Sequence, residues 1–135
     1  MPEGGNWYPT NLSTSVPRAQ IDLDALESNL REVERLVGPA VSVLAMVKAN
    51  AYGHGAPQVA RHLYQAGCRS FGVVSIAEAR TLADLAEDAR VVIFGGILPS
   101  EAPDALACRA EVVTQEADVV SALAAVARDS LKRAG

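Results

Sequence analysis

A lysine, a tyrosine and two glycines stand close together in the segment "AMVKANAYGHG", residues 45–55. Lys48 is the only charged side chain between Arg35 and Arg61, and it directly follows an apolar run. Partial desolvation lowers the pKa of a lysine, so that more of its amine is neutral and nucleophilic. Such an amine can form a Schiff base with the carbonyl carbon of a cofactor or substrate.

The residues after the lysine suit an anion held beside its amine. Gly53 and Gly55 let the backbone turn sharply towards a ligand, and the helix expected next presents unpaired N–H groups to a phosphate. Tyr52 adds a hydroxyl donor. Together these groups fit pyridoxal phosphate, which offers an aldehyde to the amine and a phosphate to the others. On the residues alone, a plain turn through Gly-His-Gly accounts for the segment equally well.

The element before the lysine is predicted to be a strand. Residues 41–47, "VSVLAMV", are almost wholly apolar, which is typical of a strand buried on both faces of a parallel sheet. The helix before this strand is predicted to begin with Asp24 as its N-cap and to end at Gly38. The helix after the lysine segment is predicted to begin past Gly55 and to end near Gly67.

The rest of the chain repeats the same alternation. Three further apolar runs predict strands at residues 71–74, 91–96 and 111–113. Ser75 and Glu78 have the spacing of a capping box, which explains Glu78 without a catalytic role. Thr114 is the expected cap of the last helix, whose apolar residues share a broad face: Val119, Val120, Leu123, Val126 and Leu131.

Strand and helix therefore alternate four times, with short connections. Such alternation predicts right-handed βαβ units and a parallel sheet. Two α/β architectures fit: an open doubly wound sheet, or a (β/α)8 barrel, which needs eight strands and typically ~250 residues. The length of 135 residues alone favours the open sheet.

The segment "MVKANAYGHG" closely resembles the cofactor-binding signature of alanine racemases, which are pyridoxal-phosphate enzymes of barrel fold. "RAQIDLDALESNLREV", "FGVVSIAEA" and "VVIFGG" resemble the first three strand and helix units of that family. Residues 1–17 hold three prolines and two glycines among Asn, Ser and Thr, a composition that favours turns and predicts a flexible arm. The resemblance implies that residues 18–135 form about four βα units of a TIM-type barrel, incomplete, without the second half of the barrel and the C-terminal β domain.

The resemblance also implies the roles of individual residues. Lys48 would carry the cofactor and act as one of two catalytic bases, and Tyr52 would contact the cofactor phosphate. Phe94 would pack near the cofactor, while His54 is expected to stabilise the loop. The second base in the family is a tyrosine from a partner subunit, and Tyr64, in a helix expected outside the barrel, is no substitute for it. Tyr8, in the arm, is no substitute either.

The implied function is the conversion of L-alanine to D-alanine for peptidoglycan precursors, by an enzyme that is a homodimer when complete. The chain alone is expected to be inactive, because its fourth strand would leave an unpaired edge and the opposite wall of the barrel would be missing. Two alternatives stay open: a related pyridoxal-phosphate barrel racemase or cofactor carrier, and a non-catalytic chain that assembles with a partner.

Composition excludes several other classes of function. The net charge of −4 and the pI near 5.1 give no basic surface for nucleic acid. No apolar stretch approaches the ~20 residues that cross a bilayer, and the N-terminus lacks a secretory pattern, so a cytoplasmic location is expected. His54 and His62 are too few for a metal site, and Cys68 and Cys108 are expected to be buried small hydrophobes.

Overall fold

The computed structural model describes residues 19–85 and 88–134, which form an α/β fold. The expected arm at residues 1–17, including Tyr8, lies outside the described residues. The strands are β1 (Leu44–Met46), β2 (Ser70–Val73), β3 (Arg90–Ile93) and β4 (Ala110–Val112). The helices are α1 (Leu23–Val37), α2 (Lys48–Tyr52), α3 (Ala56–Gln65), α4 (Ile76–Arg80), η1 (Pro99–Glu101), α5 (Ala102–Ala107) and α6 (Ala117–Ala134).

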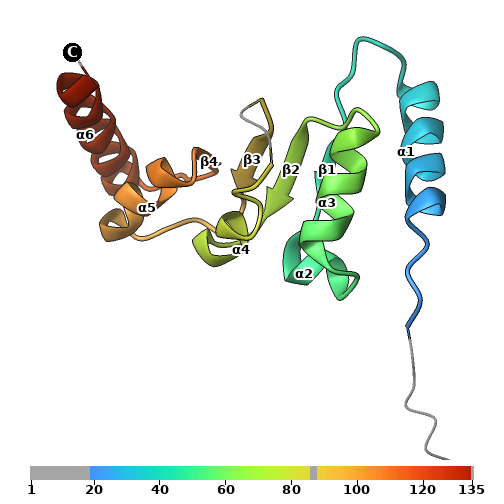
Figure 1. The fold of residues 1–135 in the computed structure, drawn as a ribbon. Coiled ribbons are helices and arrows are strands. Elements are labelled where there is room, and N and C mark those ends of the chain that lie inside the picture. The colour runs from blue at the N-terminus through green and yellow to red at the C-terminus, as the bar shows by residue number, and fades with distance from the viewer. Residues whose placement is uncertain (1–18, 86–87, 135) are drawn as a thin grey trace, which may run out of the picture.

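The four described strands form one parallel sheet in the order β1-β2-β3-β4 (Figure 1). In the register of the sheet, Ala45 pairs with Phe71, Phe71 pairs with Val91, and Val91 pairs with Ala110. A doubly wound sheet reverses its strand order at a switch point, whereas a barrel adds strands in sequence. The expectation of an open doubly wound sheet from length is therefore wrong. The α/β fold class and the sequential parallel units are confirmed.

The centre of the sheet holds the core of the protein. All residues of β2 are buried, and Phe71 and Ile93 have no exposed surface. Helix α3 covers the sheet with an apolar face that includes Ala60 and Leu63. β1, which is only half-buried, and β4 lie at the two edges of the described sheet, so within the described residues the fourth strand has the unpaired edge that was expected.

The ends of several elements differ from the sequence predictions. Helix α1 is capped by Asp22, whose Oδ1 accepts the N–H of Ala25 at 3.0 Å, so the prediction of Asp24 as the cap is wrong. Asp22 has the extended backbone that an N-cap needs, whereas Asp24 already lies in the first turn. β1 is shorter than predicted because its partner strand begins at Ser70, which pairs with Leu44.

The last helix begins later than expected. Thr114 Oγ1 accepts the N–H of Glu116 at 3.1 Å, and α6 starts only at Ala117. Thr114 therefore lies before the helix and does not cap its first turn. Val119 is buried, but Val120 and Leu131 are 54% and 75% exposed, so part of the predicted apolar face is uncovered.

A small cluster of polar side chains lies at the amino ends of the central strands β2 and β3. Tyr64 on α3 donates a hydrogen bond to Asp88, and Arg69 Nε lies 3.0 Å from the same carboxylate. The guanidinium of Arg69 also lies 4.2 Å from the centre of the Tyr64 ring. The hydrogen bond from Tyr64, more than the charge of Arg69, holds the pKa of Asp88 below its usual range.

This cluster predicts a loss of stability in acid. A carboxyl whose pKa is lowered by folding stabilises the protein above its unfolded pKa, and this contribution disappears as the pH falls through the folded value. In Asp88→Asn we expect the free energy of unfolding to fall less steeply as the pH drops below about 4. In Tyr64→Phe we expect a smaller change in the same direction. Urea unfolding at a series of pH values measures this, and an equally steep decline in Asp88→Asn would contradict the prediction.

Two classes of feature are absent from the described residues. No group of three His, Cys, Asp or Glu side chains there could hold a metal ion. Within the same ranges, no helix has the length and apolar character needed to cross a bilayer. Cys68 is buried in the core as expected, whereas Cys108 is only half-buried.

Candidate active site

Lys48 stands where the first strand ends. The hydrogen-bond ladder between β1 and β2 continues one residue past β1, because the N–H of Val47 donates to the carbonyl of Gly72 at 2.8 Å. Lys48 follows immediately and is half-buried. Figure 1 shows α2 and α4 at the same end of the sheet, where the parallel strands β1 and β2 end. In barrels of this type the carboxyl ends of the strands form the functional face.

The backbone after Lys48 takes a conformation that the sequence analysis did not foresee. Ala49, Asn50, Ala51 and Tyr52 all have positive φ angles, between 50° and 55°. Helix α2 is therefore one turn of left-handed helix made of residues other than glycine. This conformation costs roughly 1–2 kcal/mol per residue, although asparagine tolerates it better than most. Strain of this kind gathers at functional sites.

Local hydrogen bonds hold this left-handed turn closed. The N–H of Ala51 donates to the carbonyl of Val47 at 2.8 Å, and the N–H of Gly53 donates to that of Ala49 at 2.9 Å. The backbone carbonyl of Asn50 accepts the N–H of Gly55 at 2.9 Å. The side-chain oxygen of Asn50 accepts the N–H of Ala56 at 2.8 Å. These contacts connect the turn to the first residue of α3.

The first two residues of α3 do not offer the unpaired N–H groups that were expected to bind a phosphate, so that part of the prediction is wrong. The N–H of Ala56 already donates to the side chain of Asn50, and Pro57 has no N–H to offer. The sequence argument counted the N–H of Ala56 as unpaired because it did not foresee that Asn50 would reach it. An anion bound at the start of α3 would have to take other donors.

The two side chains after the turn differ in their surroundings. Tyr52 is 58% exposed, so its hydroxyl is available to a ligand. His54 Nδ1 lies 2.7 Å from the carbonyl oxygen of Ala51, a distance at which a protonated Nδ1 donates a hydrogen bond. This contact supports the expectation that His54 stabilises the loop.

Glu78 lies at the same edge, but it is not the capping-box partner that its spacing predicted. Ser75 does cap α4, since its Oγ accepts the N–H of Glu78 at 3.2 Å. The carboxylate of Glu78 does not return to the N–H of Ser75. Its Oε2 accepts the N–H of Val74, and its Oε1 accepts the N–H of Ala49, both at 2.8 Å. The long-range contact to the lysine segment could not be read from the local spacing.

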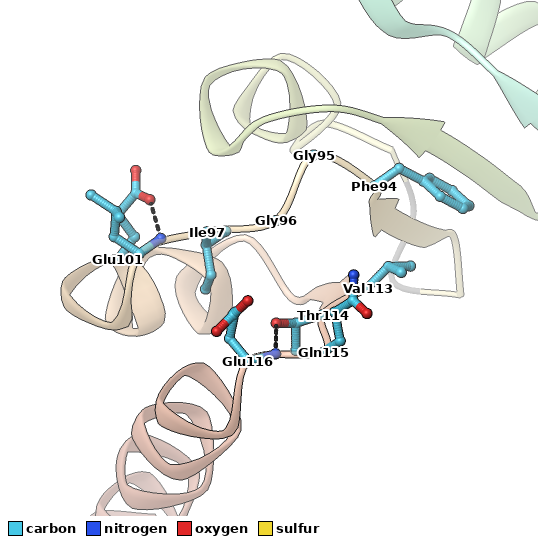
Figure 2. Close-up of a pocket in the computed structure, with 10 residues that line it drawn as sticks. Phe94, Gly95, Gly96, Ile97, Glu101, Val113, Thr114, Gln115 and Glu116 are labelled. Atoms are coloured by element: carbon cyan, nitrogen blue, oxygen red, sulfur yellow. Dashed lines mark hydrogen bonds between the residues drawn. The ribbon is translucent and has the colours of Figure 1, made fainter.

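A pocket of about 720 Å³ opens beside the ends of β3 and β4 (Figure 2). Phe94 and Gly95 line one side of it, and Thr114 to Glu116 line another. A β-carbon on Gly95 would lie 2.2 Å from the carbonyl oxygen of Val74, so this close approach requires glycine. Phe94 is 44% exposed, and Lys48 and Tyr52 are not among the residues that line the pocket.

Comparison with known proteins adds to this geometry. Residues 21–135 match the family described as "Alanine racemase, N-terminal domain". The chain belongs to the alanine racemase family. The resemblance inferred from "MVKANAYGHG" is thereby confirmed, as is membership of a family of isomerases.

Individual alanine racemases show the same relationship. The alanine racemase of Desulforamulus reducens is 34% identical over 116 residues, which cover 86% of this chain and 31% of that protein. That of Mycolicibacterium vanbaalenii is 44% identical over 83 residues, covering 62% of this chain and 21% of that protein. The chain thus spans less than a third of the length of these relatives.

Solved structures agree in fold. Alanine racemase from Bartonella henselae, whose structure has covalently bound pyridoxal phosphate, is 38% identical with a TM-score of 0.64, over 68% of this chain and 26% of that one. The biosynthetic alanine racemase of Pseudomonas aeruginosa is 34% identical with a TM-score of 0.69, over 78% of this chain and 29% of that one. The sequential α/β units therefore correspond to part of the alanine racemase fold.

Proposed function

We propose that this chain supplies the lysine-bearing site of an alanine racemase, which interconverts L-alanine and D-alanine with pyridoxal phosphate. The observation that carries this proposal is the position of Lys48. It directly follows β1 at the carboxyl edge of the sheet, half-buried, at the entrance to a strained left-handed turn. The relative with bound pyridoxal phosphate supports the choice of cofactor.

The residues at this edge fit that cofactor. The amine of Lys48 would bind its carbonyl carbon, and the exposed hydroxyl of Tyr52 would bind its phosphate. Phe94, beside the pocket at the end of β3, offers an apolar face nearby. When bound, pyridoxal phosphate supplies an electron-accepting ring that makes the α-hydrogen of an amino acid acidic. In one direction of the reaction Lys48 Nζ would remove this proton from one face of the substrate, and in the other direction it would deliver a proton to that same face.

Inversion needs a second base on the opposite face of the α-carbon. Tyr64 does not provide it, because its hydroxyl bonds Asp88 at the amino ends of the strands, away from Lys48. Apart from Tyr64 and from Tyr52, which we assign to the phosphate, no tyrosine lies within residues 19–85 and 88–134. We therefore propose that the second base comes from the partner subunit in the homodimer of the complete enzyme, and that the 135-residue chain alone does not racemise alanine.

The test is to add pyridoxal phosphate to the 135-residue chain, record its absorbance, reduce with borohydride and map the modified peptide. We expect one reduced adduct, on Lys48, and no inversion of alanine. Absence of an adduct on Lys48 would overturn the assignment of the site. Inversion of alanine by the pure chain would overturn the proposal that these 135 residues lack the second base. A role in D-alanine supply for peptidoglycan and a cytoplasmic location belong to the same proposal.

A further inference from the structure

The carboxylate of Glu78 joins two segments that lie far apart in the chain. Its Oε1 accepts the N–H of Ala49, which is 29 positions away, at 2.8 Å. Its Oε2 accepts the N–H of Val74 at the same distance. Ala49 is the first left-handed residue of the turn, and Val74 is the first residue after β2. Glu78 thus fastens the beginning of the turn to the end of the neighbouring strand.

This contact restrains Lys48 through its own peptide plane. The N–H of Ala49 belongs to the planar peptide unit that contains the carbonyl of Lys48. When that N–H is held, rotation about the Cα–C bond of Lys48 is restricted. On the other side, Val47 is held to the same strand through the carbonyl of Gly72, at 2.8 Å. Both neighbours of Lys48 are therefore held at the end of β2, Val47 directly and Ala49 through the carboxylate of Glu78.

The strained backbone of the turn needs a contact that stabilises it. A residue other than glycine stays at a positive φ only where surrounding contacts fix it, and Ala49 has a φ of 50°. Hydrogen bonds from backbone N–H groups to a carboxylate are stronger than those between neutral groups. Glu78 is also half-buried, so water competes less for its oxygens. Within the described residues, the N–H of Ala49 is bound by this carboxylate, which lies outside the turn.

We propose that Glu78 is a positioning residue that holds Lys48 in the orientation from which its amine binds the cofactor. The proposal rests on the function proposed for Lys48, although the restraint on the turn exists without cofactor. Glu78 is not assigned to the reacting atoms, because each of its oxygens accepts a backbone N–H.

The variant that tests this role is Glu78→Met, with Glu101→Met as the matched control. Methionine keeps roughly the length of the side chain but has no carboxylate oxygen, and its sulfur is only a weak acceptor. Glu101 makes the same kind of contact elsewhere, since its Oε2 accepts the N–H of Leu98 at 2.7 Å. The two variants therefore remove equivalent contacts from different loops.

The first readout is residue-resolved hydrogen exchange on the cofactor-free chain. In Glu78→Met we expect Ala49 and Val74 to exchange about 10- to 100-fold faster, because an amide bonded to a charged group loses its acceptor. In Glu101→Met we expect faster exchange at Leu98 and no change at Ala49. Unchanged exchange at Ala49 in Glu78→Met would overturn the proposal, whatever the cofactor does.

The second readout is the affinity of Lys48 for pyridoxal phosphate, followed by absorbance and confirmed by borohydride reduction. We expect binding about tenfold weaker in Glu78→Met and unchanged in Glu101→Met, since orientation of the amine contributes to its reactivity. Faster exchange with unchanged affinity would overturn the positioning role. If the unaltered chain forms no adduct on Lys48, the proposed function fails, and the exchange data still decide whether Glu78 holds the turn.

A measurement on the unaltered chain covers the case in which Glu78→Met does not fold. Scalar coupling across the hydrogen bond, between the amide nitrogen of Ala49 and the carboxyl carbon of Glu78, reports the contact directly. Detection of this coupling supports the proposal. Its absence, with couplings of the β1–β2 ladder detected in the same spectrum, overturns it.

Discussion

Lys48→Arg is expected to abolish fixation of pyridoxal phosphate on the chain while leaving the fold intact. Arginine keeps a long, positively charged side chain at this half-buried position, but its guanidinium stays protonated and does not act as a free amine. The yield of reduced adduct should fall on the order of 100-fold, because the attacking nitrogen is lost. Intact mass and peptide mapping after borohydride reduction measure this yield.

The sequence offers a close control for that experiment. The chain has two lysines, Lys48 and Lys132, and the second is exposed in the last turns of α6. Lys132→Arg should leave the adduct on Lys48 at its original yield. Equal labelling of the Lys48→Arg and Lys132→Arg variants would show that the aldehyde reacts without preference, and the site assignment would then be wrong.

Phe71→Ala is expected to remove most of the stability of the fold. Phe71 lies in β2 at the centre of the sheet and has no exposed surface, so truncation leaves a cavity between the sheet and its helices. Such a change costs about 3–5 kcal/mol, against a total stability of about 5–15 kcal/mol for an ordinary domain. Urea unfolding followed by circular dichroism should show a much lower midpoint or no cooperative transition.

The other phenylalanine of the chain provides the comparison. Phe94 is 44% exposed at the end of β3, so Phe94→Ala removes fewer core contacts and should cost clearly less than Phe71→Ala. The difference between the two variants isolates burial, because the chemical change is the same. Equal destabilisation by both would contradict the placement of the core around β2.

Much of the fold could be predicted because its signals are local. The apolar runs of the central strands, Ser75 as the cap of α4 and the glycine after α1 all depend on residues close together in sequence. The same is true of the motif "MVKANAYGHG", which indicated the family that the comparisons confirm. The choice between barrel and doubly wound sheet was different, because it depends on which strands become neighbours, and spacing along the chain does not encode that.

The sequence by itself determined the alternating α/β elements, the family and Lys48 as the candidate reactive amine. Only the tertiary structure decided the strand order β1-β2-β3-β4, the left-handed turn after Lys48 and the long-range contact between Glu78 and Ala49. The physical reason is that local propensity argues against four consecutive left-handed residues other than glycine, at roughly 1–2 kcal/mol each. Contacts from a strand and a helix far along the chain offset that cost, and they exist only once the sheet has formed.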